Sequence, residues 1–238
     1  VLFFPSIEDS GADFDAYVQS LPESLRDTLG VAGASLSSPV GYLMSQLYSN
    51  MYPLLILVMA LAAAVWAIAG AESDDTLEMT LAAPLTRWSL AAGRFAGVAI
   101  TTLAVTAVST GALAILSPVV DLQAGIPTWG LWSAGLTMWA MVMLYAGLAF
   151  GVGAAFGRKA LALGVASAVA VIGFLGQVFA SLADALEFLR TASPWYWFLG
   201  SDPLTTAPGL RSLLLPLVVC LAFAVAGTWL FTRRDLST

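Results

Sequence analysis

Residues 52–71, YPLLILVMALAAAVWAIAGA, form an unbroken apolar stretch without one charged side chain. A helix of about 20 apolar residues is long enough to cross the hydrocarbon core of a bilayer. Four further stretches also lack Asp, Glu, Lys and Arg: 95–117, 131–157, 160–183 and 212–232. Each is continuously apolar, whereas the strands of an outer-membrane barrel alternate between apolar and polar residues. The sequence therefore predicts an all-α, polytopic membrane helix bundle with five spans.

The composition of the whole chain agrees with this class and excludes several kinds of site. Of 238 residues, 59% are hydrophobic and 10% charged, against about 25% charged in an average soluble domain. The chain has no histidine and a single cysteine, Cys220, which excludes Ser–His and Cys–His pairs, HExxH zinc sites and an internal disulfide. Nine basic residues against fifteen acidic ones leave no basic stripe for phosphates. We predict no catalytic residue, no metal site and no nucleic-acid partner.

The basic residues are divided unevenly between the two sides of the predicted bundle. Six lie on one side and three on the other: Arg87, Arg94, Arg158, Lys159, Arg233 and Arg234, against Arg26, Arg190 and Arg211. By the positive-inside rule the richer side is cytoplasmic. We therefore expect a multi-pass protein of the cell membrane whose C-terminus is cytoplasmic. Because the chain would then enter from outside, the apolar VLFF at 1–4 predicts a sixth span preceding Val1.

Two segments are predicted on the external side: 1–50 outside the membrane, and 184–210 as a re-entrant part of the transmembrane domain 51–238. In the first, 1–50, apolar residues recur with helical spacing at Phe14, Tyr17, Val18 and Leu21, which predicts short amphipathic helices. In the second, 184–210, Ser193–Pro194 interrupts a helical pattern before the aromatic residues 195–198. A short helix followed by a turn near 200–203 makes 184–210 an expected re-entrant segment.

The spans carry no residue that commonly couples transport to an ion gradient. Ionisable side chains inside a membrane are costly and mark ion pathways, but the most polar long side chain in these spans is Gln177. The chain also lacks the G-x-x-x-x-G-K-[ST] motif of P-loop ATPases. If the protein moves a solute uphill, the energy must come from another subunit.

The loop between the first two spans, GAESDDTLEMTLAAPLTRWSLAAGRF at 70–95, holds a cluster of four acids: Glu72, Asp74, Asp75 and Glu78. Asp75 and Glu78 have the spacing of a capping box, which predicts a short helix over 76–82 that ends before Pro84. Thr86 is expected to cap the next helix, with Arg87 in its first turn facing the acids. Two interpretations stay open on composition alone: a handle held by a cytoplasmic partner, and a solvated connector.

The same loop resembles that of the permease subunits of type-2 ABC transporters. In those subunits a glutamate is followed by G-T-L-E, a pair of leucines, a proline and an arginine, and then by G-K. The matching residues are Glu72, Thr76, Leu77, Glu78, Leu81, Pro84, Arg87 and Gly93. Asp75 replaces the glycine, Thr80 replaces the first leucine of the pair, and Arg94 replaces the lysine. The SPWYWF segment before the last span and the basic tail extend the resemblance along the chain.

The resemblance implies a function for the coupling loop at 72–94. It would bind a separate ABC ATP-binding subunit through Glu72, Asp74, Asp75, Thr76, Leu77, Glu78, Leu81, Pro84 and Arg87. The complex would hold two such subunits and a second permease, identical or homologous, in the lipid bilayer. ATP and Mg²⁺ would be bound by the partner subunit, and no cofactor by this chain. The apolar spans favour export of a hydrophobic or amphipathic substrate.

Two sets of residues inside the spans allow more than one interpretation. Thr102, Thr106 and Ser109, with Thr110, form a hydroxyl stripe that, with Gln177, is a candidate lining of a substrate path. Alternatively, such hydroxyls bond back to the carbonyls of their own helix, which we favour. Three G-x-x-x-G pairs, 93/97, 147/151 and 153/157, predict generally tight helix packing. The alternatives for the whole protein are a non-transporting membrane scaffold or assembly protein and an ion-coupled secondary carrier.

Overall fold

The computed structural model describes residues 20, 40, 43–74, 76, 86–120, 126–179 and 192–234. These residues form α-helices with short π and 3₁₀ segments, and no strand occurs among them. In chain order the elements are η1 (Leu43–Met51), α4 (Tyr52–Val65), η2 (Trp66–Gly70), α5 (Ala71–Ser73), α7 (Arg87–Leu116), η3 (Ser117–Val120), α8 (Thr128–Phe156), α9 (Lys159–Phe179), α11 (Pro194–Leu199) and α12 (Leu210–Arg233). The predicted all-α fold is confirmed.

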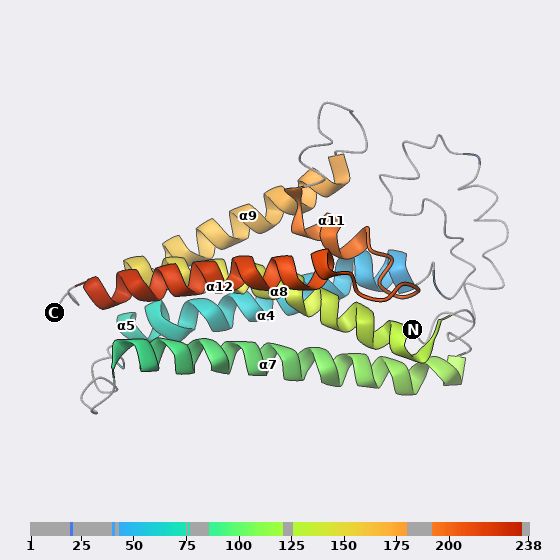
Figure 1. Cartoon of the computed structure of the whole chain (residues 1–238), viewed down its shortest axis with the longest axis horizontal. Coiled ribbons are helices and arrows are strands. Elements are labelled where there is room, and N and C mark those ends of the chain that lie inside the picture. The colour runs from blue at the N-terminus through green and yellow to red at the C-terminus, as the bar shows by residue number, and fades with distance from the viewer. Residues whose placement is uncertain are drawn as a thin grey trace.

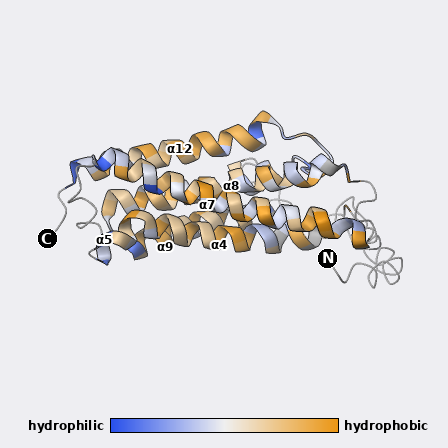
Figure 2. Cartoon of the chain, turned by 90° about the horizontal axis from the view of Figure 1, so that it is seen from below, coloured by the Kyte–Doolittle hydropathy of each residue, from blue (hydrophilic) through white to orange (hydrophobic). Residues whose placement is uncertain are grey.

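Five helical segments of the described chain are long and apolar enough to cross a membrane, as the sequence predicts. They are Leu47–Ser73, Arg87–Val119, Trp129–Phe156, Lys159–Gln177 and Leu210–Arg233. Hydrophobic residues dominate along the length of these helices, while hydrophilic residues gather toward the ends of the bundle (Figure 2). The chain is therefore a multi-pass membrane protein.

Two helices begin earlier than the apolar stretches that predict them. The first continues back through η1 to Leu43, within the segment predicted as external, and the second begins at Arg87 rather than at 95. Thr86 is confirmed as the N-cap of α7, because its side chain accepts a hydrogen bond from the Ser89 backbone amide at 3.1 Å. An uncharged stretch predicts the part of a helix that lies in the hydrocarbon core of the bilayer. The helix itself continues beyond that stretch. The connection between the first two spans therefore ends at Thr86, and the last part of the predicted coupling loop, 87–94, is helical.

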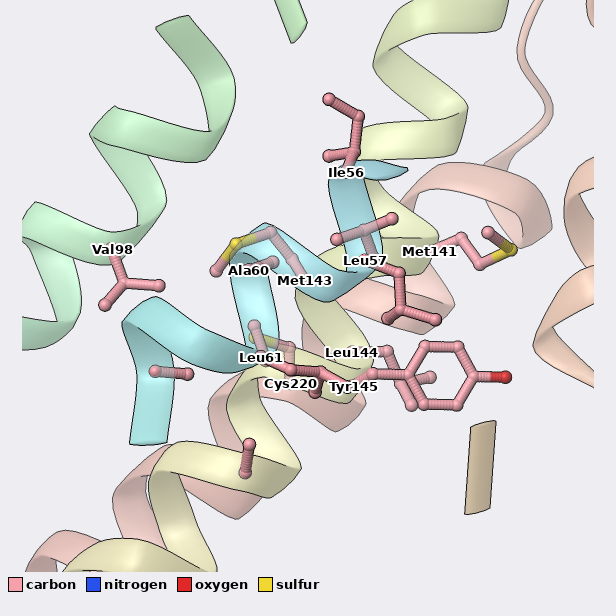
Figure 3. Close-up of a cluster of buried hydrophobic side chains, with 14 of the residues drawn as sticks. Ile56, Leu57, Ala60, Leu61, Val98, Met141, Met143, Leu144, Tyr145 and Cys220 are labelled. Atoms are coloured by element: carbon pink, nitrogen blue, oxygen red, sulfur yellow. The ribbon is translucent and has the colours of Figure 1, made fainter. Parts of the chain in front are cut away.

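The helices pack side by side around α8, with α7 and α9 on opposite sides of the bundle (Figure 1). α5, the start of α7 and the end of α12 lie together at one end, which we call the loop end. The buried cluster in Figure 3 joins α4, α7, α8 and α12 through residues that include Leu57, Val98, Met143 and Cys220. α8 is the central element, since 78% of its span is buried, against 28% of the span of α12.

α8 and α12 approach each other closely along glycines. A Cβ atom on Gly147 would lie 2.7 Å from the Cys220 carbonyl oxygen, and one on Gly151 would overlap the Phe223 carbonyl. A Cβ on Gly227 would overlap the Gly151 backbone itself. Removing Cβ atoms lets two membrane helices bring their backbones together, which maximises their dispersion contacts. Of the predicted glycine pairs, 147/151 therefore does pack a helix pair, whereas Cβ atoms on Gly93 and Gly97 would meet nothing within 4 Å.

Tyr52 joins the first two spans by hydrogen bonds inside the bundle. Its hydroxyl donates to the Thr106 carbonyl oxygen at 3.0 Å and lies 3.2 Å from Thr110 Oγ1. Tyr48, one turn earlier, packs edge-on against the Tyr52 ring, but its buried hydroxyl has no hydrogen-bond partner among the described residues. The two tyrosines thus lie one turn apart, and among the described residues only the Tyr52 hydroxyl has a hydrogen-bond partner.

We expect Tyr52→Phe to lower the free energy of unfolding by about 1 kcal/mol, the usual net value of a buried hydrogen bond. Tyr48→Phe is the matched control, and it should be neutral or slightly stabilising because it removes a buried hydroxyl that has no partner. Thermal denaturation of both variants in detergent measures the difference. Equal loss of stability in the two variants would contradict this assignment.

At the end opposite the loop end, α11 contains the aromatic cluster that the sequence predicts to follow a helix break. Ser193 caps this helix, since its Oγ accepts from the Trp195 amide at 3.2 Å and donates to the Gly173 carbonyl of α9 at 2.8 Å. Pro194 occupies its first turn, where its missing N–H costs nothing. Trp195 and Phe198 are fully buried, so α11 packs onto the bundle. The predicted helical pattern before Ser193 lies outside the described residues.

Candidate functional site

Four of the nine predicted coupling residues are described, and all four lie at the loop end. Glu72 is in α5, Asp74 follows it, Thr76 donates to the Ala71 carbonyl at 3.1 Å, and Arg87 opens α7. The other five lie outside the described residues: Asp75, Leu77, Glu78, Leu81 and Pro84. The predicted amphipathic helices before residue 40 also lie outside, with Ser20 alone described there. Both ends of the coupling loop are therefore described, but not the helix predicted between them.

Glu72 forms an ion pair with Arg234, the residue that follows α12. About a fifth of each side chain is exposed, 19% for Glu72 and 21% for Arg234, so the pair is well shielded from solvent. Arg234 Nε is also buried and has no partner among the described residues. Because removing one partner of a shielded ion pair leaves an unpaired charge, this contact holds the start of the loop against the end of the last span.

Gly157 provides the space in which that ion pair lies. It ends α8 in the left-handed conformation, with φ of +66°, which favours glycine. A Cβ at this position would lie 2.7 Å from Glu72 Oε2 and would overlap Arg234 Nη1. Gly157 is therefore needed for the turn after α8 and also for the approach of the two charged groups.

Among the described residues, Arg87 contacts the end of α12. Two of the acids that the sequence predicts it to face, Asp75 and Glu78, lie outside the described residues. Arg87 Nη1 donates to the carbonyl oxygens of Phe231 at 3.2 Å and Arg234 at 2.6 Å, and its guanidinium lies 5.6 Å from the centre of the Phe231 ring. The last carbonyls of a helix have no partner within the helix and carry partial negative charge. Arg87 thus satisfies the end of α12 from the first turn of α7.

Asp74 pairs with Lys159 at the start of α9, with 2.7 Å between Oδ1 and Nζ. About 40% of each side chain is exposed (40% for Lys159 and 43% for Asp74). Exposed ion pairs contribute little to stability because water and salt screen them. The contact places α9 near the loop but holds it weakly.

Gly157, Lys159, Phe231 and Arg234 belong to this site, although the resemblance that identifies the loop does not include them. In the sequence, Lys159 serves as a counted charge that sets the orientation, and Arg234 does so as well as belonging to the basic tail. The acidic cluster in the loop and the basic residues after the third and last predicted stretches are a usable signal, since opposite charges at the same membrane face can pair. We call Glu72, Arg87, Gly157, Phe231 and Arg234 the Arg234 cluster.

The hydroxyl stripe on α7 faces the inside of this chain. Thr102 donates to its own Val98 carbonyl at 2.9 Å and accepts from Trp139 Nε1 at 3.1 Å, and Thr106 is buried beside Tyr52. Ser109 is half-buried one turn further on. The backbone bond of Thr102 is the one the alternative interpretation predicts. A path-lining role for this stripe stays a prediction.

Gln177 lies at the far end of α9, and its buried Oε1 has no partner among the described residues. No contact between Gln177 and the α7 stripe occurs among the described residues. A groove of about 350 Å³ opens instead between η2 and α7, lined by residues that include Trp66, Thr76, Arg94 and Thr101. In the described part of the chain, no three Asp, Glu or Cys side chains lie close enough together to hold a metal ion.

Comparison with known proteins gives one match, and it covers nearly the whole chain. A family model described as ABC-2 family transporter protein matches residues 5–236. No curated protein and no solved structure matches. The match includes the coupling loop, all five spans and the Arg234 cluster.

Proposed function

The chain belongs to the ABC-2 family of transporter proteins, and we propose that it is the permease subunit of an exporter for hydrophobic or amphipathic substrates. Membership of this family implies that the chain is a transmembrane component of an ABC transporter and associates with an ABC ATP-binding subunit. The family is a transport membrane subunit and is not itself catalytic. The proposal adds the direction of transport, the substrate class, the copy number and the residues that make the contact. In the proposed complex, the loop end faces the cytoplasm.

One observation carries the proposal: the coupling loop is joined directly to two spans. Helical structure is continuous from Tyr52 to Ser73 on one side of the loop and begins again at Arg87 on the other. A helix transmits displacement along its axis because its backbone hydrogen bonds hold it as a unit. Movement of the two described ends of the loop by a bound subunit would therefore reach both spans.

The outer surface of the bundle leaves apolar faces available for a second permease. α7, α9 and α12 are mostly exposed along their spans, with 28%, 17% and 28% buried, and their exposed residues include Ile100, Ile172 and Val218. Such surfaces are compatible with lipid, with a second copy or with an apolar substrate. We propose that two permeases enclose a pathway between them, with ATP and Mg²⁺ bound by two partner subunits. Closure of those subunits would move the loop and open the pathway.

The double variant Glu78→Ala/Arg87→Ala tests the proposed contact. We expect it to detach the ATP-binding subunit or to lower permease-dependent ATP hydrolysis about tenfold, as loss of an interface hot spot does. Insertion and folding should stay nearly intact. The measurement is the amount of co-purified subunit, followed by ATP hydrolysis of the complex in liposomes. Glu78→Ala alone separates the partner contact from the bonds that Arg87 makes with α12.

The matched control is Asp202→Asn/Arg211→Ala, which also alters one acidic and one basic residue, but at the end opposite the loop end. Asp202 has a positive φ of 44°, which Asn tolerates. The control should bind and stimulate the ATP-binding subunit normally. A co-purifying partner without ATPase activity would instead support a membrane scaffold. Substrate flux that follows an imposed ion gradient without ATP would support a secondary carrier.

A further inference from the structure

We propose that Arg234 is a positioning residue of the coupling machinery, because it ties the end of the last span to both ends of the coupling loop. This inference rests on the proposed function. Arg234 lies outside the loop and follows it by more than a hundred residues. It would act through the residues it holds, without itself contacting the ATP-binding subunit.

The two ends of the loop are fixed to the same residue, Arg234. On one side, Glu72 is paired with the Arg234 guanidinium. On the other, Arg87 donates to the Arg234 carbonyl at 2.6 Å. One residue thus contacts the last element before the loop through its side chain and the first element after the loop through its main chain. A displacement of either end changes the position of Arg234.

From Arg234 the displacement has a stiff route into the bundle. α12 leads directly to Gly227, whose backbone lies against the Gly151 backbone of α8. Backbone atoms in contact cannot move aside as a flexible side chain does, so packed elements of this kind shift as units. We infer that α12 and α8 move together with the loop.

Among the described residues of the loop end, α9 makes a weaker connection. Its described ion pair there is the exposed contact between Lys159 and Asp74, which water screens. In addition, 17% of its span is buried, the smallest share among the five candidate spans. Movement of the loop is therefore expected to change the position of α12 relative to α9.

Arg234→Gln tests the role of the residue, with Arg233→Gln as the matched control. Both variants remove one positive charge from the same helix end, so their effects on membrane-surface potential are equal. Arg233 is exposed, and its guanidinium lies 3.8 Å from the centre of the Trp229 ring. With the full chain and its ATP-binding subunit in liposomes, we expect Arg234→Gln to lower permease-dependent ATP hydrolysis about fivefold. The bound amount of the subunit should stay unchanged, and Arg233→Gln should behave as the unmodified chain does.

A charge exchange distinguishes positioning from a merely structural role. Glu72→Arg and Arg234→Glu should each reduce hydrolysis per folded complex, and the two together should restore most of it because the ion pair re-forms. If the Arg234→Gln variant folds poorly, the charge exchange still tests the proposal. A folded double variant no better than either single variant would overturn the proposal, as would equal hydrolysis in the Arg234→Gln and Arg233→Gln variants. If the unmodified chain neither binds nor stimulates an ATP-binding subunit, the proposed function itself fails.

Discussion

Gly227→Ala is expected to lower the free energy of unfolding by about 3 kcal/mol, because it forces apart the two most closely packed helices of the bundle. The added methyl group would overlap the Cα and carbonyl oxygen of Gly151. Both are backbone atoms of a helix, so no rotamer change can make room. The helices must separate by on the order of 1 Å to reach normal carbon–carbon distances, which weakens the dispersion contacts along their whole interface.

The control for this prediction is the same chemical change where space is available. Gly164 lies on the exposed side of α9, and a Cβ atom there would meet nothing within 4 Å. Gly164→Ala should therefore stabilise the protein by about 0.5–1 kcal/mol, since alanine loses less backbone entropy in a helix. Unfolding of both purified variants in detergent gives the difference. Equal behaviour of the two variants would contradict close backbone packing between α8 and α12.

The glycines also illustrate what can be predicted from this sequence. The same spacing, G-x-x-x-G, occurs at 93/97, beside the charged Arg94, and at 147/151, inside an apolar stretch. Only the second of these two pairs meets another described helix, because its partner is determined by the tertiary packing of α12. Gly227 belongs to none of the predicted pairs, although its backbone lies directly against α8. Local patterns thus predict the capacity for close packing but not the place where it is used.

The five spans are predictable for a different reason. Bilayer thickness imposes a length on each apolar stretch, so a single physical constraint determines both the number and the approximate centres of the helices. Their ends are determined by capping and by tertiary contacts instead. Thr86 is a local signal and its role as N-cap of α7 is predicted correctly. The helical segment Leu43–Met51 ahead of the predicted stretch contains the buried Leu43 and Tyr48, and no local signal marks it.

The candidate site shows the same division between local and long-range information. Position in the chain and resemblance identify the coupling loop, and the residues at its two described ends lie together at the loop end. The partner of Glu72 is separated from it by most of the chain, so its identity depends on how five helices assemble. Closeness in sequence predicts that Arg87 faces nearby acids, of which Asp75 and Glu78 lie outside the described residues. Among the described residues, Arg87 satisfies the unpaired carbonyls at the end of α12, which offer fixed acceptors and which no local pattern predicts.

Gly157→Ala is the second change with a large expected effect, and it should lower the free energy of unfolding by about 3 kcal/mol. One part, about 1–2 kcal/mol, is the cost of the left-handed conformation for a residue with a Cβ. The remainder comes from displacing Arg234 and Glu72, whose ion pair occupies the space of the added methyl group. The measurement is denaturation in detergent, together with permease-dependent ATP hydrolysis.

A double-variant cycle separates the two parts of this cost. In the Arg234→Gln background the guanidinium is absent and Glu72 is no longer held by an ion pair, so adding Gly157→Ala should cost little beyond the conformational part. The interaction energy between the two substitutions is then about 1–2 kcal/mol. Additive effects would mean that Gly157 serves the turn after α8 alone and that the ion pair adjusts without loss. A measurable interaction energy would instead mean that the turn after α8, the start of the loop and the end of α12 depend on one another, as transmission through Arg234 requires.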